Sequence, residues 1–375
     1  MAGDGLRAVA ALSVLVFHTI ELVVRHQFHG DYILAFGAAP GRVLLSLNDG
    51  LYIFFVLSGY LLSRGFARAV VEGRQRPSLR RFAGSRVLRI VPAFWLAVTA
   101  TLLIRGTSGA GIGHIVALYG FAQVYALHPI NVEIIQAWTL DIEAGFYILL
   151  PLLFLAVTPW ARRASTPGAR AARLLIPLAL VTAASWVLNM KQQPSTLNAN
   201  PLQFFFAFTP GMALAIVEPL LAGRIRPRSA RIAIPAMLAA ATGLFVATCT
   251  LPQYAMDRRA GLAAIGAGCL VGAALVRQWS DGRSWRVVDN PVARWLGERS
   301  YGIYLFHWLV MLEVASLANH GRIRAVVLTT GATLVLTVAA AAVSWQFVEK
   351  PALSLRRRLS GRRTTPQAAM AEQPA

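Results

Sequence analysis

Residues 5–19 of the chain read GLRAVAALSVLVFHT, a long apolar run with an arginine near its start and a histidine near its end. In an α-helix the eleven residues from Arg7 to His18 give a rise of about 16 Å and roughly 20° beyond three full turns, so both side chains point to one side. An ionisable side chain within a bilayer is costly unless it faces a bundle interior or a wet cavity. The run therefore predicts a membrane-spanning helix whose Arg7 and His18 face other helices. Either both are functional groups, or Arg7 is an interfacial anchor and His18 is a packing residue.

The composition of the whole chain agrees with a membrane protein. Of its 375 residues, 56% are hydrophobic and 14% are charged, whereas a soluble domain carries about 25% charged residues. The net charge of +20 does not indicate nucleic-acid binding, because 27 of the 36 lysines and arginines lie in five segments between or after apolar runs. Nucleic-acid binding would need a soluble basic face with interleaved aromatic residues. We interpret the basic segments as orientation signals and contacts with anionic lipids.

Ten apolar segments are long enough to cross a membrane. They lie near 5–24, 44–63, 87–104, 137–158, 174–190, 203–222, 232–250, 260–276, 300–318 and 324–347. The basic residues gather in 64–86 with Arg89, in 159–173, 223–231 and 277–299, and in the tail from Lys350. The positive-inside rule places these segments and both termini in the cytoplasm. We therefore predict an all-α polytopic membrane protein, a bundle of about ten transmembrane helices over residues 1–358.

Several stretches do not fit this simple pattern. The region 105–136 holds a semi-apolar piece, but an eleventh span there would move the arginines of 159–173 outside. We therefore expect a re-entrant or interfacial segment on the outer side. The polar tail 359–375 is predicted to be disordered and cytoplasmic. Cys249 and Cys269 lie in apolar runs without metal or disulfide spacing, so we expect no metal site. The first apolar run lacks a basic n-region and a cleavage site, and we read it as a retained span.

The fourth span runs from outside to inside and brings a carboxylate to the expected depth of His18. It begins at Trp138, and Glu143 follows about one and a half turns below the outer surface. A carboxylate can hold one histidine nitrogen and stabilise the charged ring, which leaves the other nitrogen to act as a base. We predict His18 and Glu143 as the catalytic residues, with a buried structural ion pair as the alternative for Glu143. Asp141 lies higher and is expected to be solvated, and Trp138 and Asp141 are expected to line the substrate path or support it.

Arg86 and Arg89 stand at the cytoplasmic mouth of the third span, as Arg7 does at the first. Residues three apart are neighbours on a helix face, and arginines are suited to bidentate contacts with phosphate. Ordinary positive-inside flanking is the alternative for each arginine taken alone. The combination of a cationic inner mouth with a histidine and a glutamate across the membrane favours a functional site.

Two further elements are assigned a supporting role. Ser58 and Gly59 in the second span permit close approach of a neighbouring helix, and Tyr60 follows them. His307, in SYGIYLFHW at 300–308, is a second intramembrane histidine that we place nearer the inner side. We predict that these residues give structural support or line the substrate path.

Together these elements resemble acyltransferase family 3, bacterial membrane enzymes that O-acylate sugars and related acceptors. The resemblance covers about residues 1–355, and the elements occur in the order typical of the family. They are Arg7 and His18 with ten residues between them, FFVLSGYL at 54–61, Arg86 with Arg89, WTLDIEAGFY at 138–147, SYGIYLFH at 300–307 and FVEKP at 347–351. The chain departs from many members at Ala144-Gly145 after Glu143 and at Tyr52, where an aspartate is common. Both departures bear on which sub-family the chain belongs to and which acceptor it uses, and not on the core chemistry.

The resemblance implies an O-acetyltransferase of the bacterial cytoplasmic (inner) membrane with acetyl-CoA as donor. CoA phosphates would dock at Arg7, Arg86 and Arg89. His18, oriented by Glu143, would activate a sugar hydroxyl of an extracytoplasmic glycan, a lipid-linked precursor or a glycoside, or would first take the acyl group itself. Some members append a soluble hydrolase-like domain; we expect none here and direct delivery from the membrane domain.

A different class remains open on the residues alone. A proton-coupled secondary transporter could use intramembrane histidine and glutamate as a relay. Such proteins are typically built from inverted repeats with broken helices in corresponding positions, and the sequence displays no such pairing.

Overall fold

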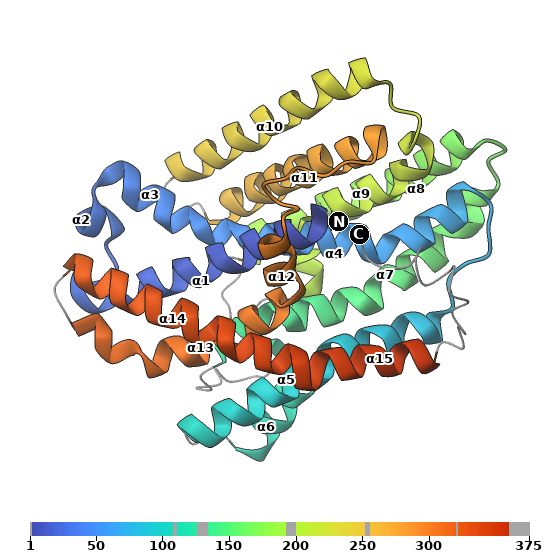
Figure 1. The fold of residues 1–375 in the computed structure, drawn as a ribbon. Coiled ribbons are helices and arrows are strands. Elements are labelled where there is room, and N and C mark those ends of the chain that lie inside the picture. Colours follow the sequence, from blue (N-terminus) through green and yellow to red (C-terminus); the bar gives the residue numbers. More distant parts are fainter. Residues whose placement is uncertain are drawn as a thin grey trace.

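The computed structural model describes residues 2–107, 111–125, 134–192, 200–251, 256–319 and 322–359, and within these the chain forms helices and no strands (Figure 1). Nine helical stretches of the described chain are long and apolar enough to cross a membrane. The long helices are α1 (Ala2–Phe28), α4 (Gly50–Val71), α5 (Leu79–Arg105), α7 (Trp138–Arg162), α8 (Pro167–Gln192), α9 (Pro201–Leu221), α10 (Pro227–Thr250), α11 (Met256–Asp281) and α14 (Arg322–Ser344). Each coincides with one of the expected spans.

The expected span at 300–318 takes a different form. It consists of α13 (Ser300–Glu313), 14 residues long, followed by the 3₁₀ turn η4 (Ala315–Asn319). Fourteen residues rise about 21 Å, less than the roughly 30 Å hydrocarbon core of a bilayer. The remaining short helices are α2 (Tyr32–Phe36), α3 (Ala38–Ser46), α6 (Ile112–Tyr119), α12 (Pro291–Glu298) and α15 (Lys350–Leu359).

The region 105–136 holds no helix long enough to span a bilayer in its described part. The helix α6 has eight residues, and it lies against α5 (Figure 1). The Trp95 indole donates to the carbonyl of Tyr119 at 3.0 Å, and the hydroxyls of Thr99 and Tyr119 are 2.7 Å apart. This agrees with a segment that does not cross the membrane. Residues 108–110 and 126–133, and the tail expected to be disordered from 360 on, lie outside the described residues.

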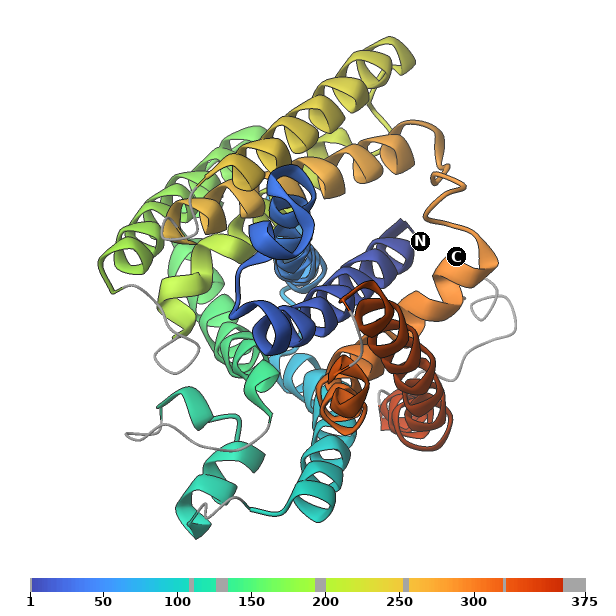
Figure 2. The ribbon, with the colours of Figure 1, turned by 90° about the vertical axis from the view of Figure 1, so that its left-hand side faces the viewer.

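Viewed end-on, α1 lies in the middle of the bundle, surrounded by other helices (Figure 2). Next to it, α4 and α9 cross with their backbones in contact. A Cβ atom on Gly59 would lie 2.1 Å from the carbonyl oxygen of Phe208, and one on Gly211 would lie 1.9 Å from that of Val56. The expectation that Gly59 permits close helix approach is confirmed. Glycine is required here because any side chain would push the two helices apart.

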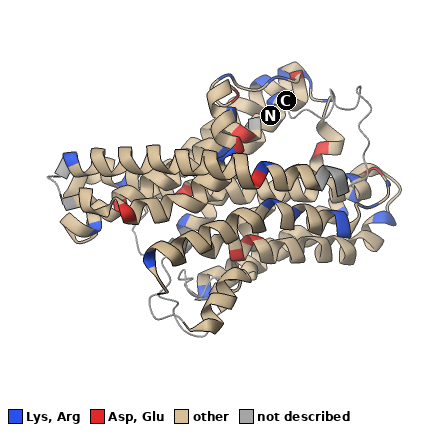
Figure 3. Ribbon diagram, turned by 60° about the horizontal axis from the view of Figure 1, so that its bottom comes forward, with Lys and Arg blue, Asp and Glu red and all other residues tan. Residues whose placement is uncertain are grey.

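The outer faces of the bundle are apolar. Leu103, Leu180 and Ile232 expose 81%, 67% and 73% of their surface, although each lies in a long helix. Figure 3 shows long uncharged stretches along the helices, with Lys and Arg mostly near helix ends. A soluble protein rarely exposes such contiguous apolar surface, so this is a multi-pass membrane protein. The connections α4–α5, α7–α8 and α9–α10 lie at one end of the bundle, which we call the basic end, and the connection α11–α12 runs from that end back toward α12 (Figure 1).

Candidate active site

His18 and His307 lie against each other inside the bundle. The Nε2 of His307 is 3.3 Å from the Nδ1 of His18, and the two ring centroids are 5.2 Å apart. The ring of Trp308 meets His18 edge-on at 5.3 Å, and Phe17 does so at 5.0 Å. His307 therefore lies at the same depth as His18. The expectation that it lies nearer the inner side is wrong. An error of this kind is natural, because α13 is shorter than the span assumed for it.

The contacts of the two rings assign their protons. The Nδ1 of His18 is 3.0 Å from the carbonyl oxygen of Val14, which can only accept, so this nitrogen carries a proton. The Nδ1 of His307 likewise donates to the carbonyl of Tyr304 at 2.6 Å, which leaves its Nε2 free to accept from His18. In the neutral His18 the Nε2 atom then holds a lone pair. This atom has no hydrogen-bond partner among the described residues, and the side chain is only half-buried.

Glu143 has other partners than the one expected for it. The hydroxyl of Ser58 donates to its Oε1 at 2.7 Å, and the hydroxyl of Tyr147 also bonds it. Within the described chain no hydrogen bond joins Glu143 to His18. The predicted direct contact between Glu143 and His18 is therefore wrong. Depth along a span could be counted from the sequence, but the rotation of α7, which decides where Glu143 points, depends on its packing against α4 and α9.

The three candidate arginines and Glu143 form one group, which we call the arginine cluster. Arg7 interacts electrostatically with Arg86, Arg89 and Glu143, and its guanidinium lies 3.7 Å from the carboxylate of Asp4. Because α1 is continuous from Ala2 to Phe28, the cluster is joined to His18 by about 16 Å of rigid helix. The structure thus brings Arg7, Arg86 and Arg89 together as predicted, and adds Glu143 to them instead of to the histidines.

Two residues that the sequence analysis quoted only within motifs also face the cluster. Glu349 is 5% exposed and accepts from the hydroxyl of Ser344 at 3.2 Å, within electrostatic range of Arg89. It ends the π-helical turn Trp345–Glu349, and such turns occur frequently at functional sites. Tyr301 donates to the carbonyl of Ile90 at 2.9 Å and lies in the field of both Glu143 and Glu349. A carboxylate directly after the late apolar run 324–347, within FVEKP, was the available signal for Glu349.

The other candidates hold the bundle together. Asp141 is 1% exposed, contrary to the expectation that it is solvated, and its Oδ2 accepts from the backbone N–H of Val124 at 3.1 Å. It therefore fixes the turn that precedes α7. The indole of Trp138 packs against Phe204, with ring centroids 5.1 Å apart.

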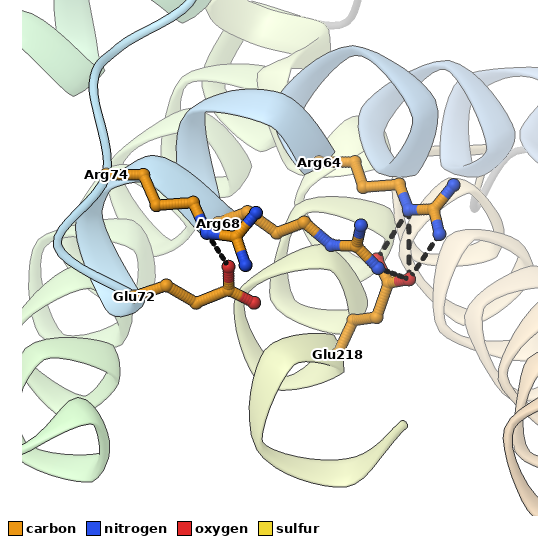
Figure 4. Close-up of polar contacts among 5 residues, drawn as sticks. All are labelled: Arg64, Arg68, Glu72, Arg74 and Glu218. Atoms are coloured by element: carbon orange, nitrogen blue, oxygen red, sulfur yellow. Dashed lines mark hydrogen bonds and ion pairs between the residues drawn. The ribbon is translucent and has the colours of Figure 1, made fainter. Parts of the chain in front are cut away.

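Tyr60 belongs to an ion-paired group between α4 and α9. Its hydroxyl bonds Glu218, and the guanidinium of Arg64 lies 5.9 Å from its ring. Arg64 and Arg68 converge on the buried carboxylate of Glu218, with closest distances of 2.6 and 3.0 Å (Figure 4). This group gives structural support to the crossing that carries Ser58.

Comparison with known proteins assigns the chain to a family. A family model described as an acyltransferase domain matches residues 3–348. The chain belongs to this family, acyltransferase family 3. The resemblance seen in the sequence motifs is confirmed, and the match lends no support to a transporter.

Named relatives extend over most of the chain. The peptidoglycan O-acetyltransferase OatA of Listeria monocytogenes is 23% identical over 375 residues, which cover 93% of this chain and 55% of that protein. Nodulation protein 10 of Rhizobium leguminosarum is 25% identical over 394 residues, which cover 96% of this chain and 95% of that protein. The chain thus spans about half the length of OatA and nearly all of nodulation protein 10. No solved structure matches it.

Proposed function

We propose that this acyltransferase moves an acetyl group from cytoplasmic acetyl-CoA to a hydroxyl of a sugar in an extracytoplasmic glycan, a lipid-linked precursor or a glycoside. The observation that carries the proposal is the state of His18. Its Nδ1 proton is held by the Val14 carbonyl and by His307, and its Nε2 lone pair is open. A neutral imidazole fixed in this tautomer is what a general base requires.

The chemistry follows from this arrangement. The Nε2 of His18 takes the proton of the acceptor hydroxyl, while the hydroxyl oxygen of the acceptor attacks the thioester carbonyl of the donor. The C–S bond then breaks, and the proton passes from His18 to the departing CoA thiolate. In the alternative route Nε2 itself attacks the thioester, the C–S bond breaks, and CoA leaves as the thiolate. The acceptor hydroxyl then attacks the acyl-histidine, the bond between the acyl carbon and Nε2 breaks, and the hydroxyl proton passes to the CoA thiolate. Both routes use the same nitrogen and need the same tautomer.

The arginine cluster supports the donor assignment. Three guanidinium groups inside a bundle are suited to a diphosphate, which arginine binds through paired, charge-assisted hydrogen bonds. The basic end would be cytoplasmic by the positive-inside rule, which would let CoA enter beside Arg7 while the thioester reaches toward His18. A sugar acceptor is supported by the name of OatA, and the protein would reside in the bacterial cytoplasmic (inner) membrane.

The direct test is His18→Ala in purified protein reconstituted with a lipid bilayer. Loss of a general base typically lowers the rate about 10²- to 10⁴-fold, so we expect acetyl transfer from acetyl-CoA to collapse while the protein still folds. His26→Ala is the matched control, because His26 is an exposed histidine on the same helix. A well-folded His18→Ala protein that keeps more than roughly a third of the wild-type rate would remove His18 from the mechanism.

A further inference from the structure

A cavity of about 750 Å³ lies in the connection between α11 and α12, apart from the groups described above. Its lining consists of Arg277, Arg283, Ser284, Trp285, Arg286, Val287 and Asp289. Its volume falls within the range of small-molecule sites. Three guanidinium groups with one indole are the chemistry that recognises a phosphorylated nucleoside, since arginine binds phosphate and tryptophan offers a face to a planar base.

The lining carries more positive than negative charge, because its three arginines accompany one aspartate, and the nearby Asp281 carboxylate accepts from the backbone N–H of Arg283 at 3.0 Å. Among the described residues no carboxylate lies within ion-pair distance of Arg277, Arg283 or Arg286, and the buried Nε of Arg277 has no hydrogen-bond partner. Asp289 is the acidic residue of the lining, and its carboxylate faces Arg294, outside the lining, at 3.3 Å. The arginine cluster around Arg7 differs, because carboxylates share its space. An anion in the cavity would therefore meet guanidinium groups that form no ion pair with another described residue.

The connection is held in one conformation by its own hydrogen bonds. The side chain of Asn290 donates to the carbonyl of Val287 at 2.9 Å and accepts from the backbone N–H of Ala293 at 2.9 Å, which caps α12. The backbone N–H groups of Val288 and Asp289 donate to the carbonyl of Trp285 at 3.1 and 2.9 Å. A preorganised wall loses less conformational entropy when a ligand binds.

The same connection lies directly on the first turns of α1. A Cβ atom on Gly5 would lie 1.6 Å from the carbonyl oxygen of Val288, and one on Gly297 would lie 2.0 Å from that of Asp4. These two glycines let backbone touch backbone. Arg7 of the arginine cluster is only two residues beyond Gly5. The connection and Arg7 of the cluster therefore both lie at the first turns of α1, although Gly5 and Arg7, two residues apart, point to different sides of the helix.

We propose that this cavity binds the 3′-phosphoadenosine end of acyl-CoA, whose diphosphate occupies the adjacent arginine cluster. The proposal rests on the proposed function, in which acyl-CoA is the donor. The 3′-phosphate carries about −1.5 to −2 charges near neutral pH, as a phosphomonoester does, and it meets Arg283 and Arg286. The adenine base lies against Trp285. In this arrangement the nucleotide stays at the connection between α11 and α12, and only the thin pantetheine arm enters the bundle.

The test compares CoA with 3′-dephospho-CoA, which differs only in the phosphate that the cavity is proposed to bind. Affinities are measured by titration calorimetry on the full chain in nanodiscs of zwitterionic lipid. The double variant Arg283→Ala/Arg286→Ala removes two exposed side chains. The control Arg228→Ala/Arg231→Ala removes two exposed arginines from α10 at the same basic end.

We expect wild type to bind CoA at least about tenfold more tightly than 3′-dephospho-CoA, as charge-assisted contacts to a phosphate imply. The cavity double variant should lose most of this preference, with CoA binding weakened about tenfold and 3′-dephospho-CoA binding almost unchanged. The α10 control should keep the wild-type preference. A cavity variant that retains the preference, or a control that loses it equally, overturns the proposal and leaves the proposed function intact.

A lipid headgroup offers the same phosphate chemistry, and two further arms separate the sources. If the cavity takes a lipid instead, anionic lipid bound to wild type in native mass spectrometry will be lost in the cavity variant, while its CoA affinity stays that of wild type. This result overturns the nucleotide assignment. If wild type itself binds no CoA under any condition, the donor of the proposed function fails as well, and the two failures are thereby distinguished.

Discussion

Replacing His307 tests how strongly the reactive tautomer of His18 depends on its neighbour. The Nδ1 proton of His18 has two acceptors, the Val14 carbonyl at 3.0 Å and the Nε2 of His307 at 3.3 Å. His307→Leu removes the longer of these contacts and leaves the carbonyl in place. The tautomer should survive, although the ring is held less firmly.

The expected loss of rate follows from the strength of the one hydrogen bond that His307 accepts from His18. A neutral hydrogen bond contributes about 0.5–1.5 kcal/mol, which corresponds to a loss of roughly two- to twelvefold in rate. We therefore expect acetyl transfer by His307→Leu to fall by roughly two- to twelvefold, well short of the 10²- to 10⁴-fold typical of a lost general base. His307→Gln should recover part of the loss, because its amide oxygen can accept from the Nδ1–H of His18.

The assay is the initial rate of acetyl transfer by purified variants, with melting temperature and gel filtration as checks of folding. A folded His307→Leu protein at the full wild-type rate would show that His307 does not hold His18. Equal losses in the Leu and Gln variants, as deep as that of His18→Ala, would instead make His307 a participant in the proton transfer. Rescue by glutamine separates positioning from a purely structural role, since both variants fill the same buried site.

Three other predictions concern the donor site, the fold and the orientation. Arg86→Ala and Arg89→Ala should weaken CoA binding about 10- to 100-fold in titration calorimetry, with poor rescue by lysine, which lacks the planar fork; unchanged affinity would remove them from the donor site. Gly211→Ala should cost about 1–3 kcal/mol through overpacking, because its Cβ would lie 1.9 Å from a backbone oxygen. The melting temperature in detergent should therefore fall, whereas Gly243→Ala, which meets no atom within 4 Å, should not lower it. A Ser78→Cys protein without native cysteines should react with an impermeant thiol reagent only after the membrane is opened, and labelling in intact cells would invert the topology.

The sequence was sufficient for the features that depend on one helix at a time. Apolar length placed the long helices, and the eleven-residue interval from Arg7 to His18 placed both on one continuous helix. Grouping Arg86 with Arg89 was equally local, since residues three apart on a helix are neighbours. These predictions need only the rise and the turn of an α-helix.

Relations between helices could not be obtained in this way. The depth of Glu143 was counted from an assumed membrane surface, but its partner is set by the rotation of α7, which is fixed where Phe146 stacks on Phe208 at 3.9 Å. His307 was assigned to the wrong depth because α13 is a short helix within the bundle. The burial of Asp141 follows from the turn at Val124, whose path no periodicity of the sequence encodes.

The central helix α1 connects the arginine cluster with His18. The same rigid helix carries Arg7 at its entrance and His18 about 16 Å further along. The distance between the proposed diphosphate contact and the proposed reactive nitrogen would therefore not change when other helices move. Under the proposed function, the thioester would therefore arrive at a depth fixed by α1. There, Phe17 and Trp308 both meet the ring of His18, with ring centroids 5.0 and 5.3 Å away. The acetyl group that the proposed function assigns to the donor would extend it by only one methyl beyond the carbonyl that His18 must reach.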